Sequence, residues 1–423
     1  MNKTIHALLF IFLIATSFQQ PDIGSKGKNV PAIIDKAVKT RIDATLKNFV
    51  DSGKITGVSA LIFEKNKEVY FNAFGYSDRE ANAPMDRNTI VRIYSMTKPV
   101  TGTALMTLYE KGAFGLDEPL SKYAPEFADM KVYKGVDASG NLILEPAKRP
   151  ITIRDVTRHT AGFATSTDLP GLRELVQKSD FMNQNNTLSE MAKKLGSLPL
   201  LFHPGEQWSY GPSVDVQALL VERLSGKPFD QYLKENIFDP LGMVHTRYVV
   251  PESDRKRFAA MYRRSDDGKL ALIPNNENTF NVKDWPLKPG GFGLTSTLDD
   301  YMKFARMLVN KGTLGKATIL KPETIKLMAT SHLSDSITQR MWLPSKGQVG
   351  FGIDFAVRLR PPASKEENHG VVGEFFWDGA ASTLFWIDPV NDLTAVLFVQ
   401  VIPFYGQLHK RFRDAVYGEY KPK

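Results

Sequence analysis

The sequence has no cysteine among its 423 residues, and this absence removes several kinds of chemistry at once. Disulfides, zinc–thiolate sites, iron–sulfur clusters and thiol nucleophiles are all excluded. The seven histidines are scattered along the chain and form no His-Glu-x-x-His pattern, so we expect no metal site. Any covalent catalysis by this chain must therefore use an oxygen or nitrogen nucleophile.

Other familiar signatures are also missing. The chain has no Gly-x-Ser-x-Gly elbow, which argues against a standard α/β-hydrolase, and no Gly-x-x-x-x-Gly-Lys-Ser/Thr, which excludes a P-loop. Lys plus Arg exceeds Asp plus Glu by only 54 − 46 = 8. Because the basic residues are scattered rather than interleaved with aromatics, we expect no nucleic-acid partner.

Long apolar runs are absent beyond the first residues. Lys3 is followed by an apolar run over 7–15 and then by small residues, which is typical of a signal peptide over 1–17. The run is shorter than the ~20 residues of a membrane span. We therefore expect an exported protein, periplasmic or secreted, with a flexible leader over 18–30 and no membrane span after signal removal. An uncleaved anchor is the alternative, and the oligomeric state is left open.

Apolar periodicity predicts strands near both ends of the chain and helices between them. The predicted helices cover 35–50, 94–111, 298–309 and 405–417, and the predicted strands cover 58–63, 69–74, 350–357, 383–387 and 393–401. This order favours an α/β (α+β) fold whose single sheet is built from distant parts of the chain. We expect a sheet domain from 31–125 with 290–423, and a mainly helical inserted domain over 126–289.

Ser95-Met96-Thr97-Lys98 is the first candidate for chemistry. A serine and a lysine three residues apart share one helical face, so the amine can reach the hydroxyl and take its proton. Free N–H groups at a helix start also favour developing negative charge. Ser-x-x-Lys alone is weak, since residues 25–28 match it too, and a helix-capping Ser95 with a solvated Lys98 is the alternative.

Two further segments carry candidate site residues. Tyr210 stands between a Pro-Gly turn and a new helix, where its hydroxyl could act as general base near Lys98 and then as acid toward the leaving group. Ala380 follows Trp377-Asp378-Gly379 at the entry to a strand that we expect at a sheet edge. Its backbone N–H, with that of Ser95, could bind an oxyanion. A packed tyrosine and an ordinary turn are the alternatives.

Taken together, these segments resemble the serine β-lactamase and penicillin-binding-protein-like superfamily, with the family VIII carboxylesterases and class C β-lactamases as the most similar branches. The resemblance covers about residues 40–420 and includes segments 151–162, 240–246 and 290–297. It implies a β-lactamase/transpeptidase-like fold, with a central antiparallel sheet flanked by helices. It also implies that Ser95 is acylated, that Lys98 and Tyr210 move the proton, and that no cofactor is needed.

The resemblance implies substrate contacts too. Trp377-Asp378-Gly379 would replace the lactamase Lys-Thr-Gly strand, while His159 would be structural. Trp377 removes the cation that suits a carboxylate, and its aromatic ring favours an uncharged acyl or alcohol group. Pro212 stands where lactamases carry asparagine, and Gly211 replaces a serine common in the esterases.

These departures favour an exported serine hydrolase acting on small-molecule carboxylic esters. The alternatives are a β-lactamase, a DD-peptidase or a D-aminopeptidase acting on cell-wall amides, and an acyltransferase. A binding protein of the penicillin-recognising type without turnover is a further alternative.

Overall fold

The computed structural model describes residues 31–165, 167–274 and 279–421. The expected signal peptide, the leader and the second Ser-x-x-Lys at 25–28 lie outside these described residues. Helix α1 (Lys36–Asp51) begins at Asp35, whose side chain accepts from the Val38 backbone N–H at 2.8 Å. The buried side chains of α1 recur at helical spacing, as its apolar pattern predicts.

A single eight-stranded antiparallel sheet joins the two ends of the chain in the order β12-β13-β14-β15-β16-β1-β2-β3. Its central pair, β1 and β16, aligns Leu61 with Val396, two residues more than 300 positions apart in the numbering. Both strands are almost entirely buried, which explains their continuous apolar sequences. The bounds are β1 Gly57–Glu64, β2 Lys67–Asp78, β3 Ala83–Pro84, β12 Val349–Phe351, β13 Ala356–Arg358, β14 Phe375–Asp378, β15 Leu384–Asp388 and β16 Leu393–Phe398.

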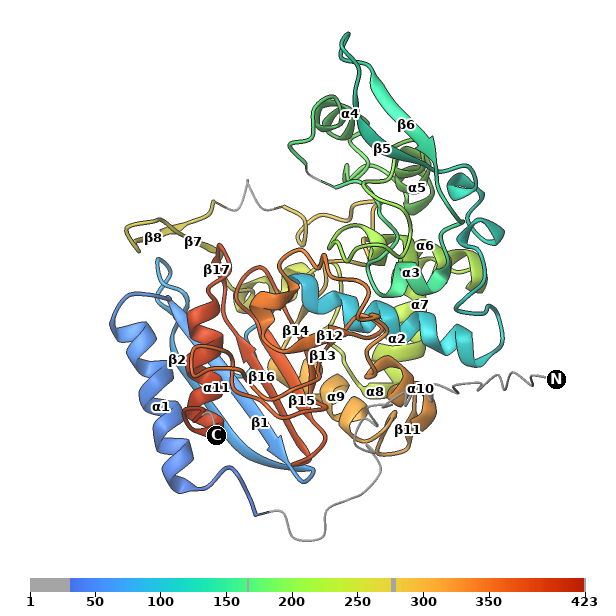
Figure 1. Ribbon diagram of the computed structural model, residues 1–423. Helices are drawn as coiled ribbons and strands as arrows, with labels where there is room; N and C mark the ends of the chain where they lie inside the picture. The colour runs from blue at the N-terminus through green and yellow to red at the C-terminus, as the bar shows by residue number, and fades with distance from the viewer. Residues whose placement is uncertain (1–30, 166, 275–278, 422–423) are drawn as a thin grey trace, which may run out of the picture.

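Helices cover both faces of this sheet (Figure 1). The N-terminal α1 packs beside the C-terminal α11 (Gly406–Tyr417) on one face, and α9 (Leu298–Val309) packs on β15, β16 and β1 from the other. Helix α2 (Thr97–Glu110) packs against α6 (Ser213–Ser225) within the helical region. This layered arrangement confirms the predicted fold class.

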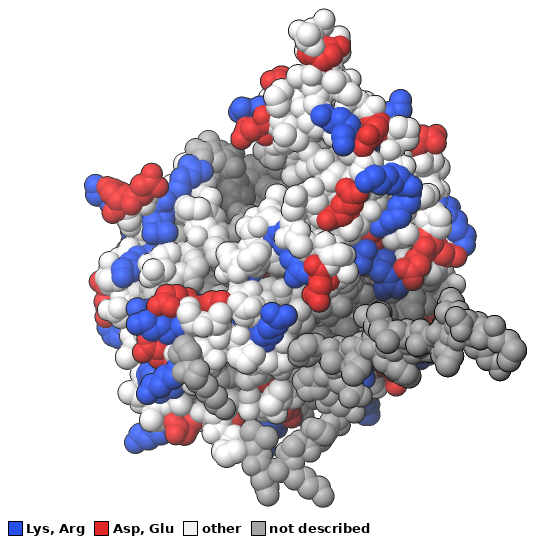
Figure 2. All heavy atoms as spheres, viewed as in Figure 1, with Lys and Arg blue, Asp and Glu red and all other residues white. Residues whose placement is uncertain are grey.

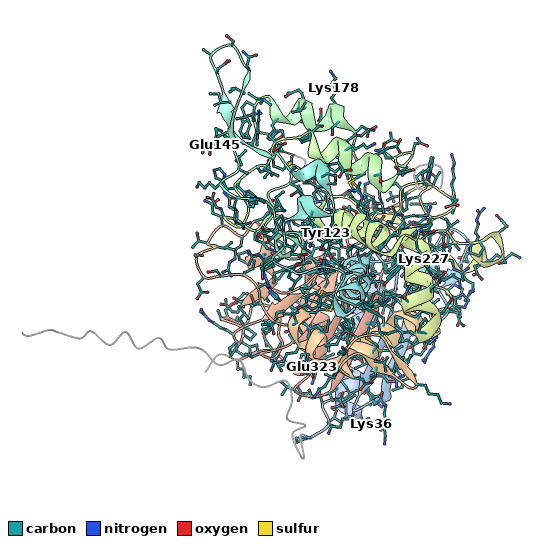
Figure 3. All side chains as sticks on the ribbon, turned by 90° about the vertical axis from the view of Figure 1, so that its right-hand side faces the viewer. Lys36, Tyr123, Glu145, Lys178, Lys227 and Glu323 are labelled. Atoms are coloured by element: carbon teal, nitrogen blue, oxygen red, sulfur yellow. The ribbon has the colours of Figure 1, made fainter. Side chains whose placement is uncertain are left out.

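The helical region also contains short hairpins that the periodicity did not predict. Figure 1 shows the hairpin of β5 and β6 projecting from the molecule, and Figure 3 shows Glu145 on this projection. The remaining helices are α3 Ile153–Thr157, α4 Leu172–Ser179, α5 Leu188–Gly196, α7 Phe229–Leu233, α8 Asp239–Leu241 and α10 Pro322–Met328. The remaining strands are β4 Val91–Arg92, β5 Lys131–Val136, β6 Leu142–Pro146, β7 Tyr262–Arg264, β8 Leu270–Leu272, β9 Thr295–Ser296, β10 Thr313–Leu314, β11 Ala317–Thr318 and β17 Val401–Ile402. The division into a sheet domain and an inserted domain stays a prediction.

Three strand predictions need correction. The segment 350–357 is not one strand but parts of β12 and β13, which a turn at Asp354 (φ 60°) joins as a hairpin. The run 393–401 ends as β16 at Phe398. The strand predicted at 383–387 is β15, which lies inside the sheet between β14 and β16 and not at an edge.

Charges of both signs alternate over the face that Figure 2 shows, without a single-sign stripe on that face. In the described ranges, we find no helix with the length and apolar character needed to cross a bilayer.

Candidate active site

Ser95 lies in a short 3₁₀ helix, η1 (Tyr94–Met96), that runs directly into α2. Its side chain is half-buried, so the hydroxyl is held but still open to a ligand. The preceding Tyr94 has φ 45°, a left-handed conformation that costs of order 1–3 kcal/mol for a non-glycine residue. Strain of this kind next to a candidate nucleophile is typical of functional sites.

The structure brings Lys98 and Ser95 together. The Nζ atom of Lys98 lies 3.4 Å from Ser95 Oγ and donates to the Gly291 carbonyl at 2.6 Å. Lys98 is buried, and a Cβ at Gly291 would stand 3.2 Å from its amine, a tight contact that glycine avoids. The solvated lysine considered as an alternative is therefore wrong, because this amine points inward at the serine.

Tyr210 enters the same site just before α6. Its ring centroid lies 4.4 Å from Lys98 Nζ, in cation–π contact. The phenol hydroxyl is buried and has no hydrogen-bond partner among the described residues. The structure thus places the ring of Tyr210 against the amine but leaves its oxygen unbonded to Ser95 and Lys98.

The turn that carries Ala380 lies against the backbone just before Ser95. A Cβ at Gly379 would meet the Ile93 carbonyl oxygen at 2.5 Å, so only glycine allows this contact. Thr383 Oγ1 donates to the same carbonyl at 3.5 Å. Ala380 itself is exposed, and we find no acceptor among the described residues for its backbone N–H. An N–H without an acceptor among the described residues, on a turn that touches the backbone two residues before Ser95, is a candidate oxyanion donor.

Trp377 and Asp378 point in different directions because successive side chains of strand β14 alternate between faces. The Trp377 ring lies 5.6 Å from that of Tyr210, centroid to centroid, so Trp377 belongs to the site. Asp378 instead pairs with Lys346 and lies 4.0 Å from His409 on α11. The structure does not bring the Asp378 carboxylate together with Ser95, because its charge is already paired on the side of α11.

Several aromatic side chains that the motifs did not reveal complete the wall. Trp342 contacts both Tyr210 and Trp377, at centroid distances of 5.0 and 6.0 Å. Phe351 lies 5.3 Å from Trp377, and Trp208 lies 6.1 Å from Tyr210. Trp342 sits more than 130 residues after Tyr210, outside any motif, so no local pattern could place it here. Trp377, Trp208 and Phe351 are buried within this cluster, whereas Trp342 is 37% exposed, so Trp342 is the ring that can present apolar surface to a ligand.

His159 lies within this aromatic cluster, 4.9 Å from Tyr210 and 5.3 Å from Phe351 between ring centroids. Complete burial, with the nearby Lys98, lowers the pKa of His159 well below its usual range. The ring is therefore neutral, and neither nitrogen has a hydrogen-bond partner among the described residues.

Two buried carboxyl groups face the amine from deeper in the protein. Asp215 accepts from the Gly291 N–H at 2.9 Å, and burial raises its pKa while Lys98 opposes the rise. Asp354 accepts from Gln217 Nε2 at 3.0 Å, but its Oδ2 has no partner among the described residues. Complete burial raises the pKa of Asp354 well above 3.8.

Asp354→Asn should make stability less dependent on pH. The folded protein keeps a proton on Asp354 at pH values where the unfolded chain has lost it, so this group's contribution to stability falls as pH rises above about 4. Asparagine keeps the bond from Gln217 and removes a slope of at most ~1.4 kcal/mol per pH unit. Urea unfolding between about pH 5 and about pH 8 should show the free energy of unfolding of the variant increasing relative to that of the parent as pH rises. A difference that stays constant, as expected for the exposed control Asp335→Asn, would contradict this.

No group of three or more His, Asp or Glu side chains in the described part of the chain is arranged to hold a metal ion. The site is thus a serine, a buried amine, a phenol, an open backbone N–H and an aromatic wall.

Comparison with known proteins places this chain in a family. The family model described as Beta-lactamase matches residues 42–415. This chain belongs to the Beta-lactamase family. Protein Rv1367c of Mycobacterium tuberculosis is 33% identical over 368 residues, which is 85% of this chain and 89% of that protein. The lovastatin esterase of Penicillium rubens is 27% identical over 406 residues, which is 90% of this chain and 98% of the esterase.

A solved structure agrees with these sequence matches. EstCE1, described as a hydrolase with promiscuous acyltransferase activity, is 26% identical to this chain and superposes with a TM-score of 0.74. The match covers 92% of this Beta-lactamase family member and all of EstCE1. The resemblance to the serine β-lactamase and penicillin-binding-protein-like superfamily is thereby confirmed, as is its fold.

Proposed function

We propose that this protein is a serine hydrolase that cleaves carboxylic esters through an acyl-Ser95 intermediate. The observation that carries the proposal is the buried amine of Lys98 lying 3.4 Å from the Ser95 hydroxyl. Membership of the Beta-lactamase family supports a hydrolase, and relatives named for ester hydrolysis support the ester as substrate.

The chemistry proceeds in two halves. Ser95 Oγ attacks the ester carbonyl carbon while Lys98, reacting as the free amine, takes its proton; the Tyr210 hydroxyl can accept this proton from Lys98 as it gives its own to the departing alcohol oxygen. The N–H groups of Ser95 and Ala380 hold the carbonyl oxygen as it becomes negative. The bond to the alcohol oxygen then breaks, and the alcohol leaves with the proton. Water attacks the acyl-enzyme by the same route, releases the acid and restores the Ser95 hydroxyl.

The substrate preference follows from the wall of the site. A β-lactam or a peptide carboxylate needs a cation, and Trp377 stands where that cation would be. Lys346, the cation beside Trp377, is already paired with Asp378. The partly exposed ring of Trp342, which packs on the buried Trp377, instead offers apolar surface to an uncharged acyl or alcohol group, which favours an ester over a cell-wall amide.

A comparison of substrates tests the proposal on the purified protein. We expect turnover of p-nitrophenyl acetate and butyrate, with nitrocefin and D-amino-acid amides hydrolysed far more slowly. A fluorophosphonate probe should add covalently at Ser95, as read by peptide mass mapping. Faster hydrolysis of nitrocefin than of the esters would overturn the assignment in favour of a lactamase. An adduct on another residue would overturn the mechanism.

Acyl transfer is the second candidate, and the description of EstCE1 as a hydrolase with acyltransferase activity favours it. Both reactions share the acyl-enzyme and differ only in whether water or an alcohol attacks it. Product analysis with an added alcohol acceptor separates them, because a transferase forms a new ester at the expense of free acid.

Export completes the proposal, with the mature protein in a periplasm or outside the cell. The apolar run after Lys3 and the small residues before position 18 support it. N-terminal sequencing of protein recovered from the producing cells tests it, since export by this signal requires a new terminus near residue 18.

A further inference from the structure

The turn 379–383, here called the oxyanion turn, is fixed from behind by contacts that take no part in the reaction. His409 Nε2 on α11 lies 2.9 Å from the Ser382 carbonyl oxygen. The Ser382 hydroxyl donates to the Val401 carbonyl at 3.0 Å and accepts from the Tyr405 N–H at 3.0 Å. Ser382 also has φ 68°, a left-handed conformation that its surroundings must hold in place.

The proton on His409 is assigned by its partner. A carbonyl oxygen can only accept, so Nε2 must carry the hydrogen and Nδ1 is left bare. Nδ1 lies 4.0 Å from Asp378 Oδ2, which is too far for a hydrogen bond, and Asp378 is itself paired with Lys346. Burial lowers the pKa of His409 to about 4, against the opposing effect of Asp378. His409 is therefore a neutral donor to Ser382 across the neutral pH range.

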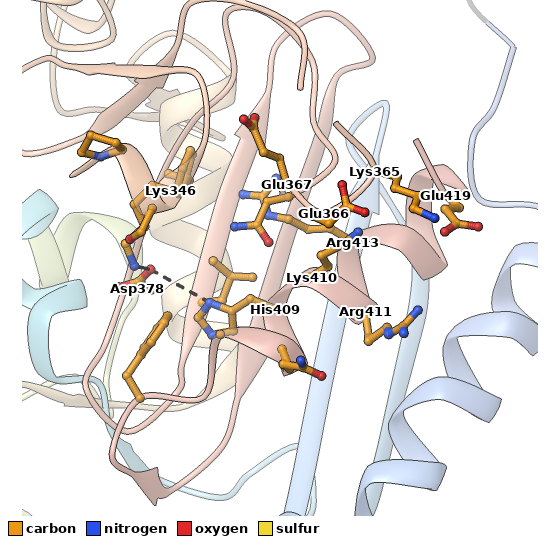
Figure 4. A pocket seen from close by; sticks show the side chains of 18 residues that line it. Lys346, Lys365, Glu366, Glu367, Asp378, His409, Lys410, Arg411, Arg413 and Glu419 are labelled. Atoms are coloured by element: carbon orange, nitrogen blue, oxygen red, sulfur yellow. Dashed lines mark hydrogen bonds and ion pairs between the residues drawn. The ribbon is translucent and has the colours of Figure 1, made fainter. Parts of the chain in front are cut away.

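Figure 4 shows Lys346, Asp378 and His409 at one end of a cavity of about 640 Å³, which lies between β14, α11 and the segments 344–346 and 365–368. Asp378 and His409 face each other across the dashed line, and Lys346 lies beside Asp378. The ring of Phe404 meets the His409 ring edge-on at 4.8 Å between centroids. The imidazole is thus held on several sides, so it can hold the turn in one position.

The oxyanion turn also closes on itself in a way that frees Ala380. The Gly379 N–H donates to the Thr383 carbonyl at 3.0 Å, and the Ser382 N–H donates to the Gly379 carbonyl at 2.9 Å. These bonds use the neighbouring backbone groups, and the Ala380 N–H has no acceptor among the described residues. Its direction depends on where Ser382 is anchored, two residues away.

We propose that His409 and the Ser382 hydroxyl are positioning groups that hold the Ala380 N–H at the place where the oxyanion forms. The inference rests on the proposed ester hydrolysis at Ser95. A donor displaced from the oxyanion stabilises the transition state less while binding the ground-state ester almost as before, so the effect falls on kcat rather than KM. A displacement of about 1 Å can cost ~10²-fold in rate.

The test compares His409→Leu with His409→Gln, since the glutamine amide can donate to Ser382 and leucine cannot. We expect His409→Leu to lower kcat for p-nitrophenyl butyrate by ~10- to 100-fold, with KM changed by less than about threefold. His409→Gln should restore kcat to within about fivefold of the parent. Thermal unfolding of each variant shows whether the protein is folded.

Each other outcome overturns the inference. A folded His409→Leu with parental kcat means that the turn needs no anchor from α11. If both variants lose the same amount of kcat and the same amount of melting temperature, His409 acts only through packing and not through its hydrogen bond. If His409→Leu does not fold, Ser382→Ala takes its place, and parental kcat in that variant overturns the role of the hydroxyl. The Ser95→Ala variant separates a failure of this inference from a failure of the proposed function. Activity that survives in Ser95→Ala refutes the proposed function itself.

Discussion

Replacing Ser95 with alanine should lower kcat/KM for p-nitrophenyl butyrate by at least ~10³-fold, the loss expected when covalent catalysis dominates. The substitution removes the hydroxyl that lies 3.4 Å from Lys98 Nζ and leaves the amine bonded to the Gly291 carbonyl. The half-buried serine carries no helix-capping bond, so the protein should fold as before. Initial rates of ester hydrolysis give kcat/KM, and thermal unfolding of the same preparation shows whether the variant is folded.

The matched control is Ser25→Ala, which changes the serine of the other Ser-x-x-Lys segment. We expect that variant to keep parental activity and fluorophosphonate labelling, while Ser95→Ala loses both. Parental activity in Ser95→Ala would refute the acyl-enzyme. A residual rate ~10³-fold above that of uncatalysed hydrolysis would not refute it, because the oxyanion donors and substrate binding remain.

Local patterns were sufficient to predict the elements that stand next to the chemistry. Apolar spacing in α9 gave its bounds, and α1 and α11 lie within a residue of their predicted ranges. These helices have one buried stripe and one solvated side, so the sequence carries their period directly. The helix after Ser95 was predicted for a different reason, because α2 is a long, mostly apolar run that is buried nearly all round.

Patterns failed where residues are buried all round or where contacts join distant segments. Strand β14 was missed because its four residues are too few to establish a pattern, whereas the longer buried runs of β15 and β16 were predicted. Only folding brings Trp342 and His409 near the site. Each lies more than 30 residues from Trp377 along the chain, and neither belongs to a recognisable motif. Asp378 was predicted to contact the substrate because it belongs to the segment Trp377-Asp378-Gly379. Strand alternation instead turns its side chain toward α11.

The aromatic wall explains why the site can be both specific and uncharged. Trp377 and Trp342 pack on each other and on Tyr210 at this side of the site. The nearby Lys346 cannot serve as a cation for a substrate carboxylate, because its partner Asp378 is buried beside it. Recruiting this lysine to a substrate would leave a buried carboxylate unpaired, at a cost of several kcal/mol.

Tyr210→Phe should lower kcat for the same ester by ~10²-fold or more, the contribution expected of a general base or acid. Phenylalanine keeps the ring that lies 4.4 Å from Lys98 Nζ, so only the hydroxyl is lost. The matched control is Tyr133→Phe, on the projecting hairpin. This change removes a hydroxyl that donates to the Pro170 carbonyl and should leave kcat unchanged.

The same substitution should not destabilise the protein. The Tyr210 hydroxyl is buried and has no partner among the residues that the structure describes. An unsatisfied buried polar group costs ~1–3 kcal/mol, so removing the hydroxyl should leave the melting temperature equal or higher. Lower activity with equal or greater stability is the expected result for a group retained for its chemistry. If Tyr210→Phe keeps kcat within threefold while Lys98→Met loses it, the amine alone moves the proton. The unbonded phenol oxygen would then be a packing feature, and the two-residue relay would be wrong.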